Sequence, residues 1–515
     1  MSSILKIISI LLCVFMFACG SSSKETNEIP DENDPAGDSD NVQPDEDSDF
    51  SDTDTSIEEN DEETVTDKDE DPDVSDEDPE ENDNETPDED TDFEELQTGG
   101  IYIFSDFDES GNAQSREILG NGGFFGFSIL TLSEKYWAVS AIHESIPAFD
   151  WEQATGKLYI FEKTKHVESL EDAAFVLNHP DKTVQVGFGY TAAAPCDING
   201  DGLDDLVVSS HLASFGDLYA AGEFVVFYGS PDGWNEETYS ISRLSSAYIQ
   251  KADSMSQSLA CLDYDGDGFA DIFAGGQNAG PELTGGGSQG MVAFFKGTPA
   301  GLSEHESWVM LPEIEEKAQY FGSSMLIEDL NGDSLPDLVI SGWGLKSDKS
   351  SANSGGIYIY SGGTDWQHGA TYKIFGEADS QFGSGLKTIE IGGKNYLAVL
   401  ATKDKNYGTV NFYDPAENFE SRGRFSFPSA FAENGNISDF DTIKLSDDTD
   451  LIVIGGKYFG NGGMTYCATV KNKTISEPEA CRFQPESPEG GFGNSVFNNK
   501  NGEIVVGMPE YIHRF

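Results

Sequence analysis

The stretch Cys196–Ser210 reads CDINGDGLDDLVVSS, in which an acidic loop leads directly into an apolar strand. Two later stretches follow the same scheme, LDYDGDGFADIFAGG from Leu262 and EDLNGDSLPDLVISG from Glu328. In all three, oxygen-bearing side chains stand at alternate positions and a glycine stands fourth in the loop. A unit that returns in this way is the first sign of a repeat architecture.

Three other elements repeat along the chain. A glycine precedes an aromatic and aliphatic strand in each unit, from GGIYIF at Gly99 to GGMTYCATV at Gly462. An apolar strand follows the same rhythm, from YWAVSA at Tyr136 to EIVVGMP at Glu503. Phe-Gly pairs open many of the units and recur about every 60 residues; they begin at Phe125, Phe188, Phe321, Phe382 and Phe492. Short alternating strands with glycine turns and no helical periodicity predict a β-propeller.

The order of these elements predicts how the ring closes. The chain enters the repeats with a lone GGIYIF strand, and its last unit, ending in EIVVGMP, lacks its outer strands. An N-terminal strand that completes the last blade removes an open sheet edge. We therefore expect an all-β fold, a seven-bladed β-propeller over residues 99–515 closed by the N-terminal strand.

With its Phe-Gly pairs, the pattern resembles the FG-GAP repeat family, the propeller of integrin α-subunit N-termini and of many exported bacterial proteins. Gly507-Met508-Pro509 is the unit that resembles the second half of the family name. The resemblance covers about four-fifths of the chain. It implies the fold, and it leaves the ligand open.

The acidic loops have the composition of sites for a hard cation. Side-chain oxygens at positions 1, 3 and 5, a backbone carbonyl at 7 and a carboxylate at 9 can surround an ion of calcium size. An EF-hand needs a Glu at position 12, where this chain has Val208, Ala274 and Ile340. We predict three structural Ca²⁺ sites, in blades 2, 3 and 4 only. Their ligands are Asp197, Asn199, Asp201, Leu203 and Asp205; Asp263, Asp265, Asp267, Phe269 and Asp271; and Asp329, Asn331, Asp333, Leu335 and Asp337.

The N-terminal residues are of a different kind. The apolar run Ile7–Ala18 is too short to span a bilayer and fits the core of a signal peptide. Its end, Met16-Phe17-Ala18-Cys19 before Gly20, resembles the lipobox of bacterial lipoproteins, which implies a lipidated Cys19 and an outer-membrane or cell-surface location. A cleaved signal with an incidental cysteine is the alternative. We predict a signal peptide over 1–18 and a lipidated, disordered acidic linker over 19–98, because like charge with few apolar residues prevents folding.

Catalytic and redox signals are weak. Gly286–Gly290 matches G-x-S-x-G, but a strand is predicted after it where a nucleophile elbow needs a helix. The histidines are scattered singly, so we expect no enzyme. Cys467 and Cys481 lie across a predicted hairpin and are a possible disulfide in an oxidising envelope. Cys196 and Cys261 are offset by one position relative to their loops and are expected to remain buried thiols, with a disulfide as the alternative.

The two faces of the propeller are expected to carry different kinds of loop. A formal net charge of −65 excludes nucleic acid as a partner. The acidic loops lie on one face. The longer connections lie on the other and carry scattered aromatic residues; they begin at Ala141, Ser210, Gly275 and Ser341. We expect this long-loop face to bind an unknown protein or glycan, in the manner of an adhesion module. An envelope hydrolase or lyase and a purely structural envelope protein are the alternatives.

Overall fold

The computed structural model describes residues 99–121, 123–143, 156–181, 187–250, 252–281, 289–348, 353–403, 408–426, 436–457, 463–471, 474–476, 478–483 and 491–509. All of them belong to the unit Asp90–Phe515. The expected signal peptide, Cys19 and the acidic linker lie outside the described residues. Short 3-10 turns at Leu170–Asp172, Trp366–His368 and Pro415–Glu417 are the helical elements among the described residues. None of these helices is long and apolar enough to cross a membrane.

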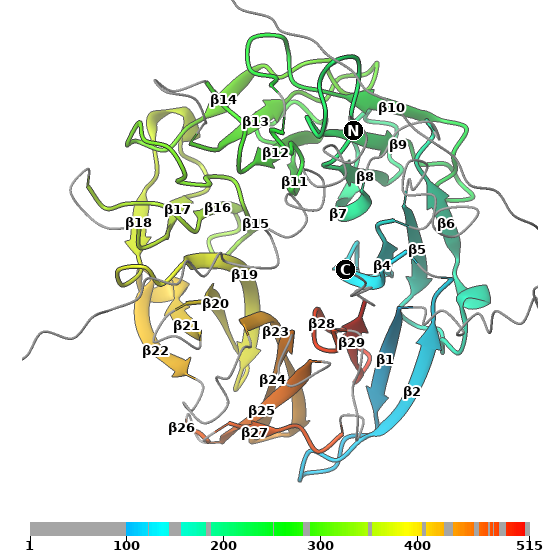
Figure 1. Ribbon diagram of the computed structural model, residues 1–515, viewed down its shortest axis with the longest axis vertical. Helices are drawn as coiled ribbons and strands as arrows, with labels where there is room; N and C mark the ends of the chain where they lie inside the picture. Colours follow the sequence, from blue (N-terminus) through cyan, green and yellow to red (C-terminus); the bar gives the residue numbers. More distant parts are fainter. Residues whose placement is uncertain are drawn as a thin grey trace, which may run out of the picture. The chain divides into compact units, whose positions relative to one another are not determined.

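The described strands form seven antiparallel sheets arranged as the blades of a propeller (Figure 1). Each of the first three blades takes its strands in chain order. Blade 1 holds β3 (Phe125–Thr131), β4 (Tyr136–Ala141), β5 (Lys157–Glu162) and β6 (Phe175–Asn178); blade 2 holds β7 (Phe188–Cys196), β8 (Asp205–Ser210), β9 (Glu223–Phe227) and β10 (Tyr239–Ser242); blade 3 holds β11 (Ser258–Leu262), β12 (Asp271–Gly276), β13 (Met291–Phe295) and β14 (Trp308–Met310).

The next three blades repeat this order. Blade 4 holds β15 (Met325–Glu328), β16 (Asp337–Gly342), β17 (Gly356–Tyr360) and β18 (Tyr372–Phe375); blade 5 holds β19 (Phe382–Ile391), β20 (Lys394–Ala401), β21 (Thr409–Asp414) and β22 (Glu420–Ser426); blade 6 holds β23 (Asn436–Ser446), β24 (Thr449–Lys457), β25 (Met464–Lys471), β26 (Thr474–Ile475) and β27 (Glu479–Ala480). The first strand of each blade contacts the first strands of its neighbours around the ring.

Blade 7 joins the two ends of the domain. Its order is β28 (Val496–Asn498), β29 (Ile504–Met508), β1 (Gly100–Ser105) and β2 (Gln114–Leu119). Strand β1 pairs with β29 from Gly100 opposite Met508 to Phe104 opposite Ile504. The predicted seven-bladed fold and its N-terminal closure are confirmed. The prediction of a lone N-terminal strand was incomplete, because Gln114–Leu119 adds a second, outer strand.

The repeated glycines and Phe-Gly pairs meet between blades. Gly355, just before β17 of blade 4, forms a parallel bridge with Phe382, which opens β19 of blade 5. A Cβ on Gly355 would lie 2.1 Å from the carbonyl oxygen of Phe382, so only glycine allows the backbones to approach this closely. The Phe382 side chain is buried in an apolar cluster shared by blades 4 and 5. The glycine before the third strand of blade 4 and the Phe-Gly pair of blade 5 therefore form one contact between the two blades.

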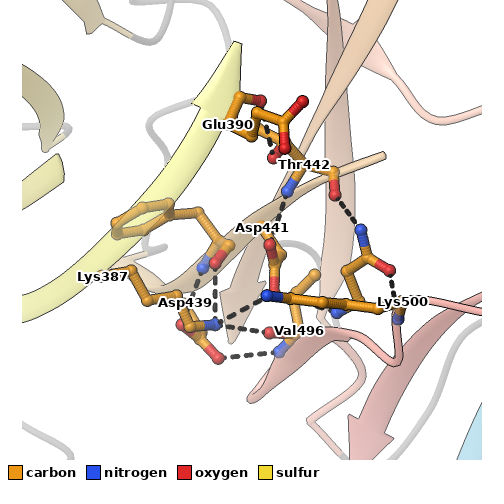
Figure 2. A network of polar contacts seen from close by, with 9 residues as sticks. Lys387, Glu390, Asp439, Asp441, Thr442, Val496 and Lys500 are labelled. Atoms are coloured by element: carbon orange, nitrogen blue, oxygen red, sulfur yellow. Dashed lines mark hydrogen bonds and ion pairs between the residues drawn. The ribbon is translucent and has the colours of Figure 1, made fainter. Parts of the chain in front are cut away.

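A polar network ties blades 5, 6 and 7 together near the closure (Figure 2). The Lys387 ammonium, on β19, donates to Asp439 Oδ1 on β23 at 2.9 Å and to the carbonyl of Val496 on β28 at 2.7 Å. Asp439 Oδ2 also accepts the backbone N–H of Val496. One lysine thus links the first strands of three successive blades.

Two disulfides occur among the described residues. Cys467 is joined to Cys481 within blade 6. Cys196 is joined to Cys261, which links β7 of blade 2 to β11 of blade 3. The expectation that Cys196 and Cys261 remain thiols was wrong. A register shift in β7 between Ala193 and Cys196 compensates for the one-residue offset that argued against the bond.

Candidate functional site

The acidic loops lie where the sequence predicts, between the first and second strands of three successive blades. Asp197–Asp204 connects β7 to β8, Asp263–Ala270 connects β11 to β12, and Asp329–Pro336 belongs to the connection between β15 and β16. We call them the blade 2, blade 3 and blade 4 loops, each together with the aspartate that opens its second strand. That ninth residue is Asp205, Asp271 or Asp337.

In the blade 3 loop the acidic side chains converge. Carboxylate oxygens of Asp263, Asp265 and Asp267 all lie within 4.8 Å of one another, and all three side chains are exposed. The backbone folds around them, because Asp263 Oδ2 accepts the N–H of Gly268 and Asp267 Oδ1 accepts that of Phe269. The loop therefore gathers three carboxylates at one point on the surface.

The other two loops share this hydrogen-bond framework. Position 1 accepts the N–H of position 6, from Gly202 to Asp197 at 3.0 Å and from Ser334 to Asp329 at 2.8 Å. Position 5 accepts the N–H of position 7 in both loops, at Asp201 and at Asp333. Ser334 adopts a positive φ of 71°, close to the 83° of Gly202. The serine in the blade 4 loop thus keeps the turn that glycine forms in the other two.

The ninth residue plays a different part. Asp205 accepts the N–H of Ile198 within the loop and that of Gly229 beyond β9, and Asp271 and Asp337 make the equivalent pairs of bonds. All three are fully buried. Burial is the main reason why their pKa values are raised. The pKa is about 6 for Asp205 and for Asp271, and that of Asp337 is raised for the same reason. Asp271 is not part of the converging group. Its carboxylate instead stabilises the backbone of the loop through its two hydrogen bonds.

Two observations bear on whether a cation fits. Asp197 Oδ1 is buried with no hydrogen-bond partner among the described residues. In the blade 3 loop the ammonium of Lys296 pairs with Asp265 and, at 2.8 Å, with Asp267. This hydrogen bond is the largest cause that lowers the pKa of Asp267. The donors are all oxygens and already attract a positive charge, which is the environment that a hard cation needs.

The corresponding connections in blades 5 and 6 are built differently. Strands β19 and β20 are joined by Gly392 and Gly393 alone. Thr442 and Lys444, which stand where the sequence puts the missing ligands of blade 6, lie inside strand β23. In blade 7, Glu503 at the end of the connection pairs with the guanidinium of Arg116 at 2.6 Å.

The opposite edge of blades 1, 2 and 4 carries aromatic side chains. This aromatic rim consists of residues that precede the first strand or follow the second strand, with one residue near the start of β7: Phe124, His143, Tyr190, His211, Tyr320 and Trp343. They pack in pairs, Phe124 with His143, Tyr190 with His211 at 4.1 Å, and Tyr320 with Trp343. Burial lowers the pKa of His143 to about 4 and that of His211 to about 3, so both are neutral at physiological pH.

Tyr320 and Trp343 form the tightest pair of the rim. Their rings stack at 3.5 Å between centroids and 11° between planes, and both are partly exposed. Trp343 Nε1 donates to Gln277 Oε1 at 3.1 Å, and Gln257 Nε2 nearby is buried without a hydrogen-bond partner among the described residues. This arrangement offers a flat apolar surface next to amide groups.

Sequence reasoning placed His143, His211 and Trp343 on long connections but missed Tyr320, Phe124 and Tyr190. A signal was available. The residue before each Phe-Gly pair needs a positive φ, which Gly187 and Gly491 supply in blades 2 and 7. Tyr320 holds a φ of 55° and Phe124 a φ of 62°, so a bulky residue where the fold favours glycine is the signal that distinguishes these two positions.

Two candidate catalytic groups belong to the long connections, Ser288 and Asp253. Ser288, the centre of the G-x-S-x-G match, lies outside the described residues, and strand β13 follows it from Met291. Asp253 is buried there, and burial raises its pKa to about 7. Its hydrogen bond comes from the backbone N–H of Gln250.

Comparisons with known proteins agree with this architecture. Residues 188–227, from β7 to the end of β9, match the FG-GAP repeat family model. The chain is 27% identical over 177 residues to integrin alpha-PS2 of Drosophila melanogaster, covering 32% of this chain and 12% of that protein. It is 30% identical over 214 residues to integrin alpha-PS5 of the same organism, covering 40% and 18%.

A second group of relatives has a different name. The chain is 29% identical over 259 residues to human phosphatidylinositol-glycan-specific phospholipase D, covering 47% of this chain and 29% of that protein. The chain therefore spans less than a third of the length of each of these three relatives. The described domain is an FG-GAP, integrin-like β-propeller.

Proposed function

We propose that this protein is a calcium-stabilised, membrane-tethered binding module outside the cytoplasm. The propeller presents the aromatic rim to a protein or glycan partner, and the acidic loops on the other face maintain the fold. The observation that carries the proposal is the separation of these two features, because the groups suited to a metal and the groups suited to a partner lie at opposite ends of the same strands.

The acidic loops support calcium as the cation. Three carboxylates converge in the blade 3 loop, and the same backbone framework recurs in the blade 2 and blade 4 loops. Calcium accepts six to eight oxygen ligands in flexible geometry, whereas magnesium requires a small octahedral shell. A bound calcium ion would neutralise the crowded carboxylates. It supplies no chemistry to a substrate in this proposal.

The N-terminal sequence supports a lipid anchor. The apolar run up to Ala18 and the cysteine that follows it are the features of a lipoprotein signal. The acidic residues between Cys19 and the propeller suit an extended spacer, because like charges repel along the chain. Cys19→Ser should abolish the incorporation of labelled fatty acid, and incorporation equal to wild type would disprove the anchor.

The aromatic rim supports binding in preference to a structural role. Partly exposed tryptophan and tyrosine next to amide groups are typical of interface hot spots. The relatives named integrin support a protein partner, and the Tyr320–Trp343 surface also fits the apolar face of a sugar ring.

The test is a paired binding experiment on the full-length protein. Glycan arrays and pull-downs of surface proteins are compared for wild type, Trp343→Ala and a control, Tyr239→Ala, in which an exposed tyrosine on the outer strand β10 is removed. For any ligand that both wild type and Tyr239→Ala bind, we expect Trp343→Ala to weaken the affinity by about 30-fold, as for a hot-spot residue. Equal binding by all three proteins would exclude the rim as the binding surface.

One observation favours an enzyme as a second candidate, namely the similarity to phosphatidylinositol-glycan-specific phospholipase D. The assay is the hydrolysis of a phosphatidylinositol-linked glycan by the purified protein: water cleaves the bond between phosphate and inositol, which releases the inositol-linked glycan and leaves phosphatidic acid. Turnover that Asp253→Asn abolishes would favour this candidate over the binding module.

A further inference from the structure

We propose that the blade 2 and blade 3 loops form one coupled pair of cation sites, whereas the blade 4 loop binds its cation independently. The proposal rests on the calcium sites proposed above. It concerns the contacts between neighbouring loops, which are dense at one junction and sparse at the other.

The first contact joins the two backbones. The N–H of Ala270, in the blade 3 loop, donates to the carbonyl oxygen of Asp197, in the blade 2 loop, at 2.8 Å. Asp197 is the first ligand position of its loop, and Ala270 directly precedes Asp271, the ninth position of the other. A shift of either loop upon binding an ion therefore moves a ligand residue of its neighbour.

The second contact is a side chain that fills the neighbouring turn. The ring of Phe269 packs against Gly200 so closely that a Cβ on Gly200 would lie 2.5 Å from Phe269 Cε1. Gly200 holds a positive φ of 73° at the sharp bend of the blade 2 loop. Phe269 is the residue whose carbonyl is expected to bind the ion of the blade 3 loop, so its position couples that carbonyl to the adjacent turn.

The third link is covalent. Cys196 directly precedes Asp197, Cys261 lies two residues before Asp263, and the disulfide between them holds their Cα atoms 6.1 Å apart. The bond therefore fixes the two strand ends from which the loops begin. With the hydrogen bond and the aromatic contact, it connects the start, the middle and the end of the paired loops.

The junction between blades 3 and 4 provides an internal comparison. Pro336 occupies the place of Ala270 and has no N–H to donate. Leu335 occupies the place of Phe269 and is 46% exposed, and a Cβ on Gly266 would meet nothing within 4 Å. Tyr264 does reach blade 4, but its hydroxyl contacts Asp365 and Trp366 in the connection between β17 and β18, outside the blade 4 loop.

These contacts have a thermodynamic consequence. Binding of an ion orders the oxygens of one loop, and rigid links to the second loop order part of that loop as well. The second ion then binds at a smaller entropic cost, which is positive coupling. Because coupling is reciprocal, each loop should raise the calcium affinity of the other by the same factor.

The experiment is a thermodynamic cycle on the full-length protein with calcium as the ligand, read by titration calorimetry. Asp333→Ala leaves the blade 2 and blade 3 loops, and adding Asp201→Ala or Asp267→Ala leaves one of them. Asp333→Ala yields two calcium association constants, and each double variant yields one. We expect the product of the two constants in Asp333→Ala to exceed the product of the constants of the two double variants by at least about fivefold. The matched cycle on blades 3 and 4 starts from Asp201→Ala. Its two products of association constants should agree within about twofold, the level for uncoupled sites.

A second set of variants removes the links themselves. Ala270→Pro copies the residue of the uncoupled loop, and Cys196→Ser with Cys261→Ser removes the covalent link; each should reduce the coupling while leaving two sites. Circular dichroism confirms that each variant is folded. Binding without coupling at either junction would overturn this inference and leave the calcium sites intact. The absence of calcium binding in wild type would instead overturn the proposed function.

Discussion

The ammonium of Lys387 on blade 5 lies 2.9 Å from Asp439 Oδ1 on blade 6 and also bonds the backbone of blade 7 (Figure 2). Burial by itself lowers the pKa of Lys387, but the carboxylates of Asp439 and Asp441 outweigh it and raise that pKa above its ordinary value. The lysine therefore stays charged, and its ion pairs hold the first strands of three blades near the closure of the ring.

Replacement of this lysine should destabilise the propeller. Lys387→Met removes three hydrogen bonds from the ammonium and leaves two carboxylates without their cation. Both partners are about a quarter exposed, so we expect a loss of about 1–3 kcal/mol in the free energy of unfolding. Chemical denaturation measures it. Lys444→Met is the control, because its pair with Asp447 is exposed and should contribute less than about 0.5 kcal/mol.

The N-terminal closure makes a prediction about truncation. A chain that starts at Gly99 should melt at the same temperature as the full-length protein. A chain that starts at Asp106 lacks β1, which leaves β29 unpaired along one side, and should melt at least about 5 °C lower. Equal melting temperatures for the two truncated chains would show that β1 contributes nothing to the stability of the ring.

Asp253 should give the protein a measurable pH dependence. Burial raises its pKa to about 7, whereas an unfolded aspartate titrates near ~3.9. Between about pH 4 and pH 7 the folded state holds a proton that the unfolded state has lost, so this residue lowers stability as the pH rises. The ceiling is about 4 kcal/mol for three pH units.

Asp253→Asn mimics the protonated form and keeps an acceptor for the N–H of Gln250. In saturating calcium, the variant should match wild type near pH 4 and melt higher at pH 8. The difference between the two melting curves isolates Asp253 from the acidic loops and the histidines. A constant difference from pH 4 to pH 8 would contradict the raised pKa.

The sequence predicts the propeller because the residues that join neighbouring blades belong to short, repeated sequence motifs. Gly355 and Phe382 each belong to a repeated motif, so seven similar units can be counted without knowledge of the contacts. The acidic loops are found for the same reason, since each lies within one turn between two strands. The extra strand Gln114–Leu119 was missed because its exposed polar residues do not resemble the repeated strands.

Features that depend on contacts between separate strands or blades were not predictable from the sequence. The disulfide between Cys196 and Cys261 depends on a register shift in β7, and sequence spacing does not reveal such a shift. The stack of Tyr320 on Trp343 joins residues from different ends of two strands, and Lys296 reaches the blade 3 loop from the end of β13. Each depends on a tertiary contact for which no local pattern exists.

Loss of a single acidic ligand should destabilise the propeller when calcium is present. Asp267→Ala removes one of the three converging carboxylates and the bond that caps Phe269. A site filled at one to ten times its dissociation constant contributes about 0.4–1.4 kcal/mol, and three sites together a few kcal/mol. The variant should lose at least one site's contribution, and more if the blade 2 and blade 3 loops are coupled, and its melting temperature should respond less to calcium than that of wild type.

The most direct measurement is the melting temperature of the wild-type protein in chelator, in calcium and in magnesium. If calcium holds the three loops, chelation should lower the melting temperature by several degrees, and calcium should restore it more fully than magnesium. A melting temperature that is the same in chelator and in calcium would contradict the claim that these acidic loops stabilise the propeller through a bound ion.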